Sequence, residues 1–159
     1  MKVLLVGQSD SFPGGMSNYM AMLKKYLDTR DDVEYYHLNE SAAKGRSEMT
    51  GPPGAMLVVQ WLRLRRELAK VAREQRPDVA HLHVAHGKSI IEKADLARLL
   101  RKQGIPCLIH MHGSSTIADI DTLPKKLRSW IGGGYSLPNR IIALATTLRN
   151  DLLGCTLVQ

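Results

Sequence analysis

Glycines or histidines end or follow three apolar segments of this chain, where a plain β-sheet has no need of them. They are Gly14 and Gly15 after residues 2–6, His83 at the end of residues 79–83, and His112 and Gly113 after residues 106–111. In an open parallel sheet the carboxyl ends of the strands line the ligand crevice. The sequence therefore predicts a binding site made by these three segment ends.

The glycine pair has two interpretations. Without a Cβ, Gly14 and Gly15 let backbone N–H groups approach a ligand, and the helix that we expect to begin there favours an anion such as a phosphate. A tight turn before a helix explains the same dipeptide equally well. The fingerprint G-x-G-x-x-G is absent after Gly7, which argues against a nicotinamide or flavin dehydrogenase.

A second glycine-containing segment partly matches the pattern of a phosphate-binding loop. Gly87, Lys88 and Ser89 follow an apolar segment and open a helical pattern. A phosphate-binding loop would need another glycine at the position of Leu82, so that interpretation fails. We expect Lys88 and Ser89 to supply a helix start and a solvated charge.

Five of the six histidines fall in two groups, namely His81, His83 and His86, and His110 and His112. Alternation along a strand puts residues i and i+2 on one face, which makes a metal site conceivable. No Asp, Glu or Cys joins these histidines at a ligand spacing, so we expect no metal and no cofactor, and hydrogen-bonded core histidines instead. His112 differs because Gly113 ends the segment after it, and we expect this imidazole to contact a ligand.

Short β-rich segments alternate with helical patterns along the whole chain, which predicts an α/β fold of the Rossmann-like, three-layer kind with a parallel sheet. The expected strands are residues 2–6, 33–38, 79–83, 106–111 and 140–144, and the expected helices begin near residues 15, 55, 89, 125 and 146. Residues 39–54 read as an irregular loop, and Gly132, Gly133 and Gly134 as a flexible helix end. The 159 residues fit a single domain.

The net charge and the aromatic and cysteine contents indicate which kinds of partner and compartment to expect. The formal charge of +7 favours an anionic partner such as phosphate, acidic lipid or nucleic acid. Only 5% of residues are aromatic and no nucleic-acid-binding module is recognisable, so we do not expect a nucleic-acid partner. Two cysteines without metal-ligand spacing fit a reducing compartment, and neither a signal peptide nor a membrane span is evident, so we expect a cytoplasmic protein.

The helix expected over residues 55–75 has two faces. Its apolar face consists of Leu57, Trp61, Leu64, Leu68 and Val71. Its basic face consists of Arg63, Arg66, Lys70 and Arg73. Such a helix could pack its apolar face on the sheet while its basic residues meet acidic lipid headgroups, each contributing ~1 kcal/mol near a charged surface. A solvated face of an ordinary surface helix explains the same pattern equally well.

Four blocks, taken in order and spacing, resemble the amino-terminal half of family 4 glycosyltransferases. They are the glycine pair with Met16, residues 77–83, residues 104–113, and residues 139–144 followed by 148–153. The resemblance covers nearly the whole chain.

The resemblance implies a GT-B enzyme that moves a sugar from a nucleotide-sugar to an acceptor, with retention of configuration and without a metal. It implies a strand order of 2-1-3-4-5. It also implies that Gly14, Gly15 and Met16 lie beside the donor phosphate and the acceptor, that His112 contacts a hydroxyl of the transferred sugar, and that His83 and Gly113 border the same site.

In that family a second, carboxy-terminal domain binds the nucleotide, and its motifs do not occur in residues 1–159. The expectation is therefore an acceptor-side half that is inactive by itself and needs a donor-binding domain or subunit. Similar transferases often use lipid-linked acceptors, which fits peripheral attachment at the inner membrane face. The alternative is a non-catalytic Rossmann-like module that binds a glycan, a lipid headgroup or a protein. The sugar, the nucleotide, the acceptor and the oligomeric state are not readable from these residues.

Overall fold

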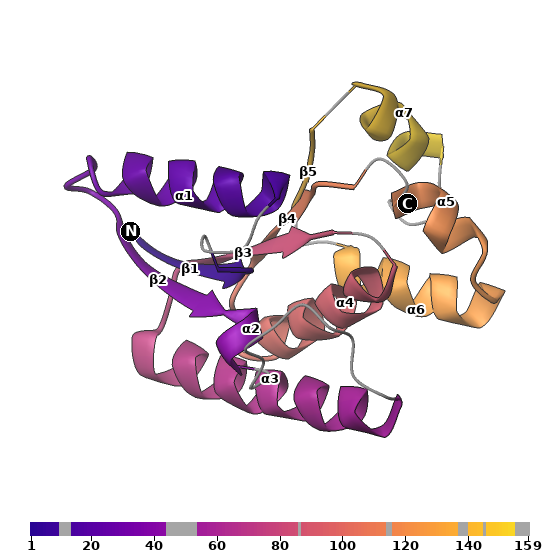
Figure 1. Ribbon diagram of the computed structural model, residues 1–159, viewed down its shortest axis with the longest axis horizontal. Helices are drawn as coiled ribbons and strands as arrows, with labels where there is room; N and C mark the ends of the chain where they lie inside the picture. The colour runs from indigo at the N-terminus through magenta and orange to yellow at the C-terminus, as the bar shows by residue number, and fades with distance from the viewer. Residues whose placement is uncertain are drawn as a thin grey trace. The chain divides into compact units, whose positions relative to one another are not determined.

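The computed structural model of the chain describes residues 1–9, 14–43, 54–85, 87–113, 116–136, 140–144 and 146–154 (Figure 1). Among them, five strands form one sheet in the order β2-β1-β3-β4-β5. The strands are β1 (Lys2–Gly7), β2 (Glu34–Asn39), β3 (Val79–Val84), β4 (Cys107–Met111) and β5 (Arg140–Ala143). β1 pairs with β2, β3 with β4, and β4 with β5, all in parallel. The α/β class and the strand order 2-1-3-4-5 are confirmed.

Helices connect the strands. They are α1 (Gly15–Leu27), α2 (Glu40–Ala43), α3 (Gly54–Gln75), α4 (Lys88–Arg101), α5 (Thr116–Asp121), α6 (Lys125–Tyr135) and α7 (Thr146–Gly154). The strands and the helices α1, α3, α4 and α7 lie within two residues of their predicted positions. The short helices α2 and α5 were not predicted.

Residue contacts divide the chain into two compact units, unit 1 (Met1–Asp78) and unit 2 (Val79–Gln159). In unit 1, Leu4, Leu5 and Val6 of β1 are completely buried. Helix α1 covers one face of the β1–β2 pair and α3 covers the other (Figure 1). The hydroxyl of Tyr35 in β2 donates to Asp28 Oδ1 at the end of α1, over 2.8 Å. Side chains of β1 and β2 therefore alternate between an α1 face and an α3 face.

Residues 40–43, expected to belong to an irregular loop over residues 39–54, form the helix α2, so that expectation was wrong at its start. Asn39 ends β2, and its Oδ1 accepts the backbone N–H of Ala42 in α2 over 3.3 Å. A side chain that satisfies the first turn of a helix in this way is a helix cap, which local composition did not signal. Residues 44–53 lie outside the described part of the chain.

Unit 2 is built around a close contact of α4 with α6. A Cβ at Gly134 would lie 2.5 Å from the backbone oxygen of Ala94, so only glycine allows the two helices to come this near. The hydroxyl of the buried Tyr135 donates to the backbone oxygen of Ile90 over 2.7 Å. Gly132, Gly133 and Gly134 thus lie inside α6, where Gly133 and Gly134 pack on α4, and the expectation that they form a flexible helix end was wrong.

Candidate functional site

Four histidines share one face of β3 and β4 in unit 2. In the parallel register His83 lies opposite His110, so His81 and His83 on β3 and His110 and His112 along β4 point to the same side. His81, His83 and His110 are buried, with exposed fractions of 7%, 1% and 2%, and His112 is half-buried. We call these four residues the histidine cluster.

The rings of the histidine cluster contact one another pairwise across the two strands. His81 Nε2 lies 3.2 Å from His110 Nδ1, and His83 Nδ1 lies 2.9 Å from His112 Nε2. Along each strand the ring centroids are 4.2 Å apart, for His81 with His83 and for His110 with His112. The sequence grouped these residues by strand, and the register pairs them across strands.

Burial keeps the histidine cluster uncharged. Desolvation lowers the pKa of His81 and of His110 to about 4, and the neighbouring histidines add to the effect. The pKa of His83 is lowered further by the same causes, and burial also lowers the pKa of His112. At neutral pH each ring therefore carries one N–H donor and one nitrogen lone pair. Such rings can hydrogen-bond a hydroxyl or bind a metal ion.

His112 and Gly113 follow the last residue of β4, as predicted. The backbone N–H of His112 donates to the backbone oxygen of Val84 over 2.9 Å, which extends the strand pairing beyond Met111. The side chain of His112 is held at His83. The structure thus brings together two of the predicted site residues, His83 and His112.

The glycine pair begins helix α1 in unit 1. Gly14 has a φ of +145°, a conformation that favours glycine, whereas Gly15 begins the helix itself. Among the described residues, nothing lies within 4 Å of a Cβ built at either position. Met16 is partly buried in the first turn. Both glycines are exposed, so a ligand could reach their backbone N–H groups.

Ser17, in the same first turn, was missed by the sequence analysis. Its exposed fraction is 1%, and its Oγ has no hydrogen-bond partner among the described residues. A buried hydroxyl beside the N–H groups at a helix start is a fitting donor for an anion. No sequence signal marks a lone serine at this position. These residues belong to unit 1 and the histidine cluster to unit 2, and each is described by itself.

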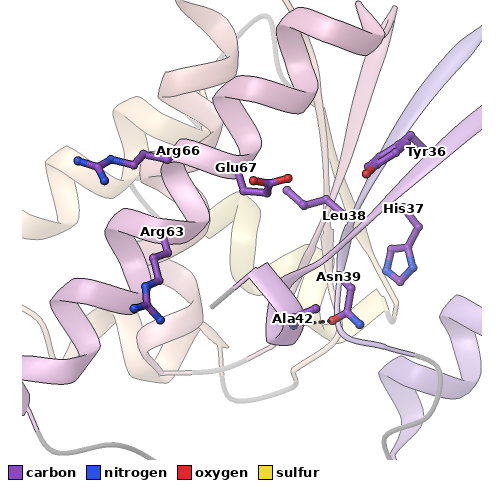
Figure 2. Close-up of a pocket in the computed structure, with 8 residues that line it drawn as sticks. All are labelled: Tyr36, His37, Leu38, Asn39, Ala42, Arg63, Arg66 and Glu67. Carbon is purple, nitrogen blue, oxygen red and sulfur yellow. Dashed lines mark hydrogen bonds between the residues drawn. The ribbon is translucent and has the colours of Figure 1, made fainter. Parts of the chain in front are cut away.

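A pocket of about 550 Å³ lies in unit 1 between the end of β2, helix α2 and helix α3 (Figure 2). Its lining consists of Tyr36, His37, Leu38, Asn39, Ala42, Arg63, Arg66 and Glu67. Figure 2 shows Glu67 pointing from α3 toward β2, whereas Arg66 points away from the strand. Carboxylate, amide, guanidinium and phenol groups together suit a ligand with many hydroxyl groups. Asn39, at the end of a strand, was the sequence signal that could have identified this pocket.

The predicted basic face of α3 is confirmed as exposed, and the apolar face is confirmed in part, because Leu57 and Trp61 are only half-buried. Leu64, Leu68 and Val71 are buried, and the basic residues Arg63, Arg66, Lys70 and Arg73 are exposed. Val58, Val59 and Leu62 are exposed as well, by 54%, 47% and 44%. Spacings of four residues place Val59 next to Arg63 and Leu62 next to Arg66 on the helix surface. The basic face therefore adjoins an exposed apolar surface. We call the two together the α3 outer face, which consists of Val58, Val59, Leu62, Arg63, Arg66, Lys70 and Arg73.

Within the described part of the chain, no helix is long and apolar enough to cross a membrane.

The comparison with protein families found one match. The model of Glycosyltransferase Family 4 matches residues 13–157, which is most of the chain. The comparisons with curated proteins and with solved structures found no match. The α/β fold with strand order 2-1-3-4-5 agrees with this family match. The chain belongs to glycosyltransferase family 4.

Proposed function

We propose that residues 1–159 form the acceptor-side half of a retaining GT-B glycosyltransferase that uses a nucleotide-sugar as its donor. The observation that supports this proposal best is the contact of 2.9 Å between His83 and His112 at the carboxyl ends of two neighbouring strands. Ligands of open α/β sheets bind at such strand ends. Membership of the family makes a sugar the natural ligand there.

In this proposal His112 contacts a hydroxyl group of the transferred sugar. The Nε2 atom of His112 lies 2.9 Å from Nδ1 of His83, and in this proposal Nδ1 of His112 bonds the sugar hydroxyl. Because burial lowers the pKa of His112, the ring is neutral and forms an uncharged hydrogen bond. A ring already held by a neighbour loses little conformational freedom on binding, which favours an accurate position of the sugar.

The glycine pair would stabilise the leaving group of the transfer reaction. Backbone N–H groups at Gly14 and Gly15, the amino end of α1 and the hydroxyl of Ser17 would stabilise the negative charge that develops on the departing diphosphate. Met16 would border the same region. The helix supplies no side-chain cap of its own at Gly14, which leaves this end suited to an external anion.

The pocket beside β2 is our candidate for the site that binds part of the acceptor. Its volume of about 550 Å³ is within the range of small-molecule sites. Glu67 and Asn39 could bind sugar hydroxyls, and Arg63 could bind an acidic group of the acceptor. The nucleotide of the donor would bind to a second domain, carried by the same polypeptide or by another one.

The test compares two variants in an enzyme that contains both halves. His112→Ala should lower kcat by about 100-fold, a typical cost of removing one positioned hydrogen-bond donor, and change the melting temperature little. The buried His110→Asn should do the reverse and lower the melting temperature more than kcat. Equal activity of His112→Ala and the parent enzyme would end this assignment. Glycan binding without any transfer would favour the non-catalytic module instead.

The α3 outer face supports a second proposal, peripheral attachment to an acidic membrane at its cytoplasmic side. Exposed Val58, Val59 and Leu62 could enter the interface while Arg63 and Arg66 meet lipid phosphates. A liposome sedimentation assay tests it, with and without acidic lipid. We expect binding only with acidic lipid, and at least tenfold weaker binding by the double variant Arg66→Glu/Lys70→Glu. Binding that is indifferent to lipid charge would contradict the proposal.

A further inference from the structure

We infer that His81, His83 and His110 form a binding site for one transition-metal ion of the Zn²⁺ type. One ring nitrogen from each of these three residues lies within 4.8 Å of the other two. All three residues are buried in the same unit and come from two directly paired strands. The inference does not depend on the proposed function.

The spacing of the nitrogens is close to that of a metal site. Zinc binds histidine nitrogens at 2.0–2.1 Å, so two ligands of a tetrahedral ion lie about 3.4 Å apart. His81 Nε2 and His110 Nδ1 are already 3.2 Å apart. The ligand nitrogen of His83 lies within 4.8 Å of the other two, so the rings would have to move closer together to complete the set. An ion would replace the contact between His81 and His110.

The ligand types select the class of metal. Three neutral imidazoles suit Zn²⁺, Co²⁺, Ni²⁺ and Cu²⁺, whereas Mg²⁺ and Ca²⁺ require oxygen ligands. From the sequence no metal was expected at these histidines, because no Asp, Glu or Cys joins them. A site of three histidines needs none, and only the strand register shows that His110 completes it.

His83 would connect the ion to the proposed sugar contact. Since Nδ1 of His83 contacts His112, its Nε2 is the atom for the ion. A metal-bound histidine commonly donates its other N–H to a neighbouring acceptor, which fixes the orientation of both groups. The ion would thus hold His83 and, through it, His112, and we assign it no part in the transfer reaction.

One buried cation acts against the site. The charge of Lys93 contributes to the lowered pKa of His83, and its ammonium group is 1% exposed. Its Nζ lies 3.2 Å from Glu92 Oε1, so a carboxylate offsets that charge in part. The remaining repulsion between Lys93 and the metal ion must be outweighed by the binding free energy of the three imidazole ligands.

The experiment uses the full chain, purified through a histidine-free tag and stripped with a chelator. We expect about one Zn²⁺ per chain by mass spectrometry after reloading, a higher melting temperature with Zn²⁺, and the strong visible absorption of tetrahedral Co²⁺. The chain should also be refolded with Zn²⁺ present, because the site is buried. Wild-type protein that retains no metal by either route and shows no thermal shift overturns the inference.

Matched variants locate the ion. His81→Asn and His110→Asn should each weaken Zn²⁺ binding by at least about tenfold. His37→Asn, on β2, removes a histidine outside the cluster and should bind as the wild type does. Equal binding by all three variants would show that the metal is held elsewhere and would also overturn the inference. If a cluster variant fails to fold, the wild-type stoichiometry and thermal shift decide.

Discussion

Unit 1 and unit 2 use the same residue types in opposite surroundings. In unit 1 the glycine pair before α1 is open, and the basic residues of the α3 outer face are exposed. In unit 2 Gly134 is pressed against Ala94, and the histidine cluster is largely buried. An exposed polar group that bonds a protein partner loses a bond to water, so the gain in folding free energy is small. A buried polar group that loses its partner has no water to replace it, so the loss of folding free energy is larger. The buried contacts of unit 2 are therefore expected to contribute more to the stability of the fold than the exposed groups of unit 1.

The largest effect that we expect is a loss of stability at acidic pH, caused by unit 2. In the unfolded chain the histidines titrate near pH 6.5, and in the folded chain His81 and His110 titrate at about 4. Between these values the unfolded state binds more protons, so the free energy of unfolding falls as the pH falls. Urea unfolding at about pH 7.5 and about pH 5 measures this. The double variant His81→Asn/His110→Asn should show a shallower dependence, and an unchanged slope would remove the histidine cluster as its cause.

Next in size is the substitution Gly134→Ala. The added Cβ would lie 2.5 Å from the backbone oxygen of Ala94, so α4 and α6 must move apart, at a cost of about 1–3 kcal/mol. The matched substitution in unit 1, Gly15→Ala, meets open space and should change the free energy of unfolding by less than about 0.5 kcal/mol. Urea unfolding of both variants checks the difference. Equal losses would mean that the two units are packed alike.

A smaller effect distinguishes two tyrosine hydroxyls. Tyr135 in unit 2 is buried and donates to the backbone oxygen of Ile90, so Tyr135→Phe should cost about 1 kcal/mol. Tyr35 in unit 1 donates to Asp28 at the exposed surface, so Tyr35→Phe should cost only a few tenths of that. Thermal unfolding of the two variants measures the difference. A larger loss for Tyr35→Phe would reverse the comparison.

The smallest effect on stability is expected on the α3 outer face. Arg63→Ala and Arg66→Ala remove exposed guanidinium groups, so each should change the free energy of unfolding by less than about 0.5 kcal/mol. The same variants should weaken binding to acidic liposomes. A loss of stability without a loss of liposome binding would show that these arginines serve the fold.

The strands, the long helices and the two faces of α3 could be predicted because they follow from local periodicity. Leu64 and Leu68 are buried and Arg63 and Arg66 exposed, as their spacing along one helix requires. The pocket beside β2 could be predicted only in part, because Asn39 at the end of a strand is a local signal whereas Glu67 comes from an element far away in the sequence. The three glycines of α6 were misread because a glycine run signals a loop unless a second helix packs on it.

The amino-acid sequence by itself determined the order of strands and helices, the family resemblance and the exposure of the basic residues. The strands, the helices and the exposure depend on neighbours within a few positions, and the resemblance depends on the order and spacing of four blocks along the chain. Only the tertiary structure decided that His83 lies opposite His110, that His112 is held at 2.9 Å by His83, and that Gly134 meets Ala94. Register between strands and contact between helices are set by the packing of distant segments, and no local pattern encodes that packing.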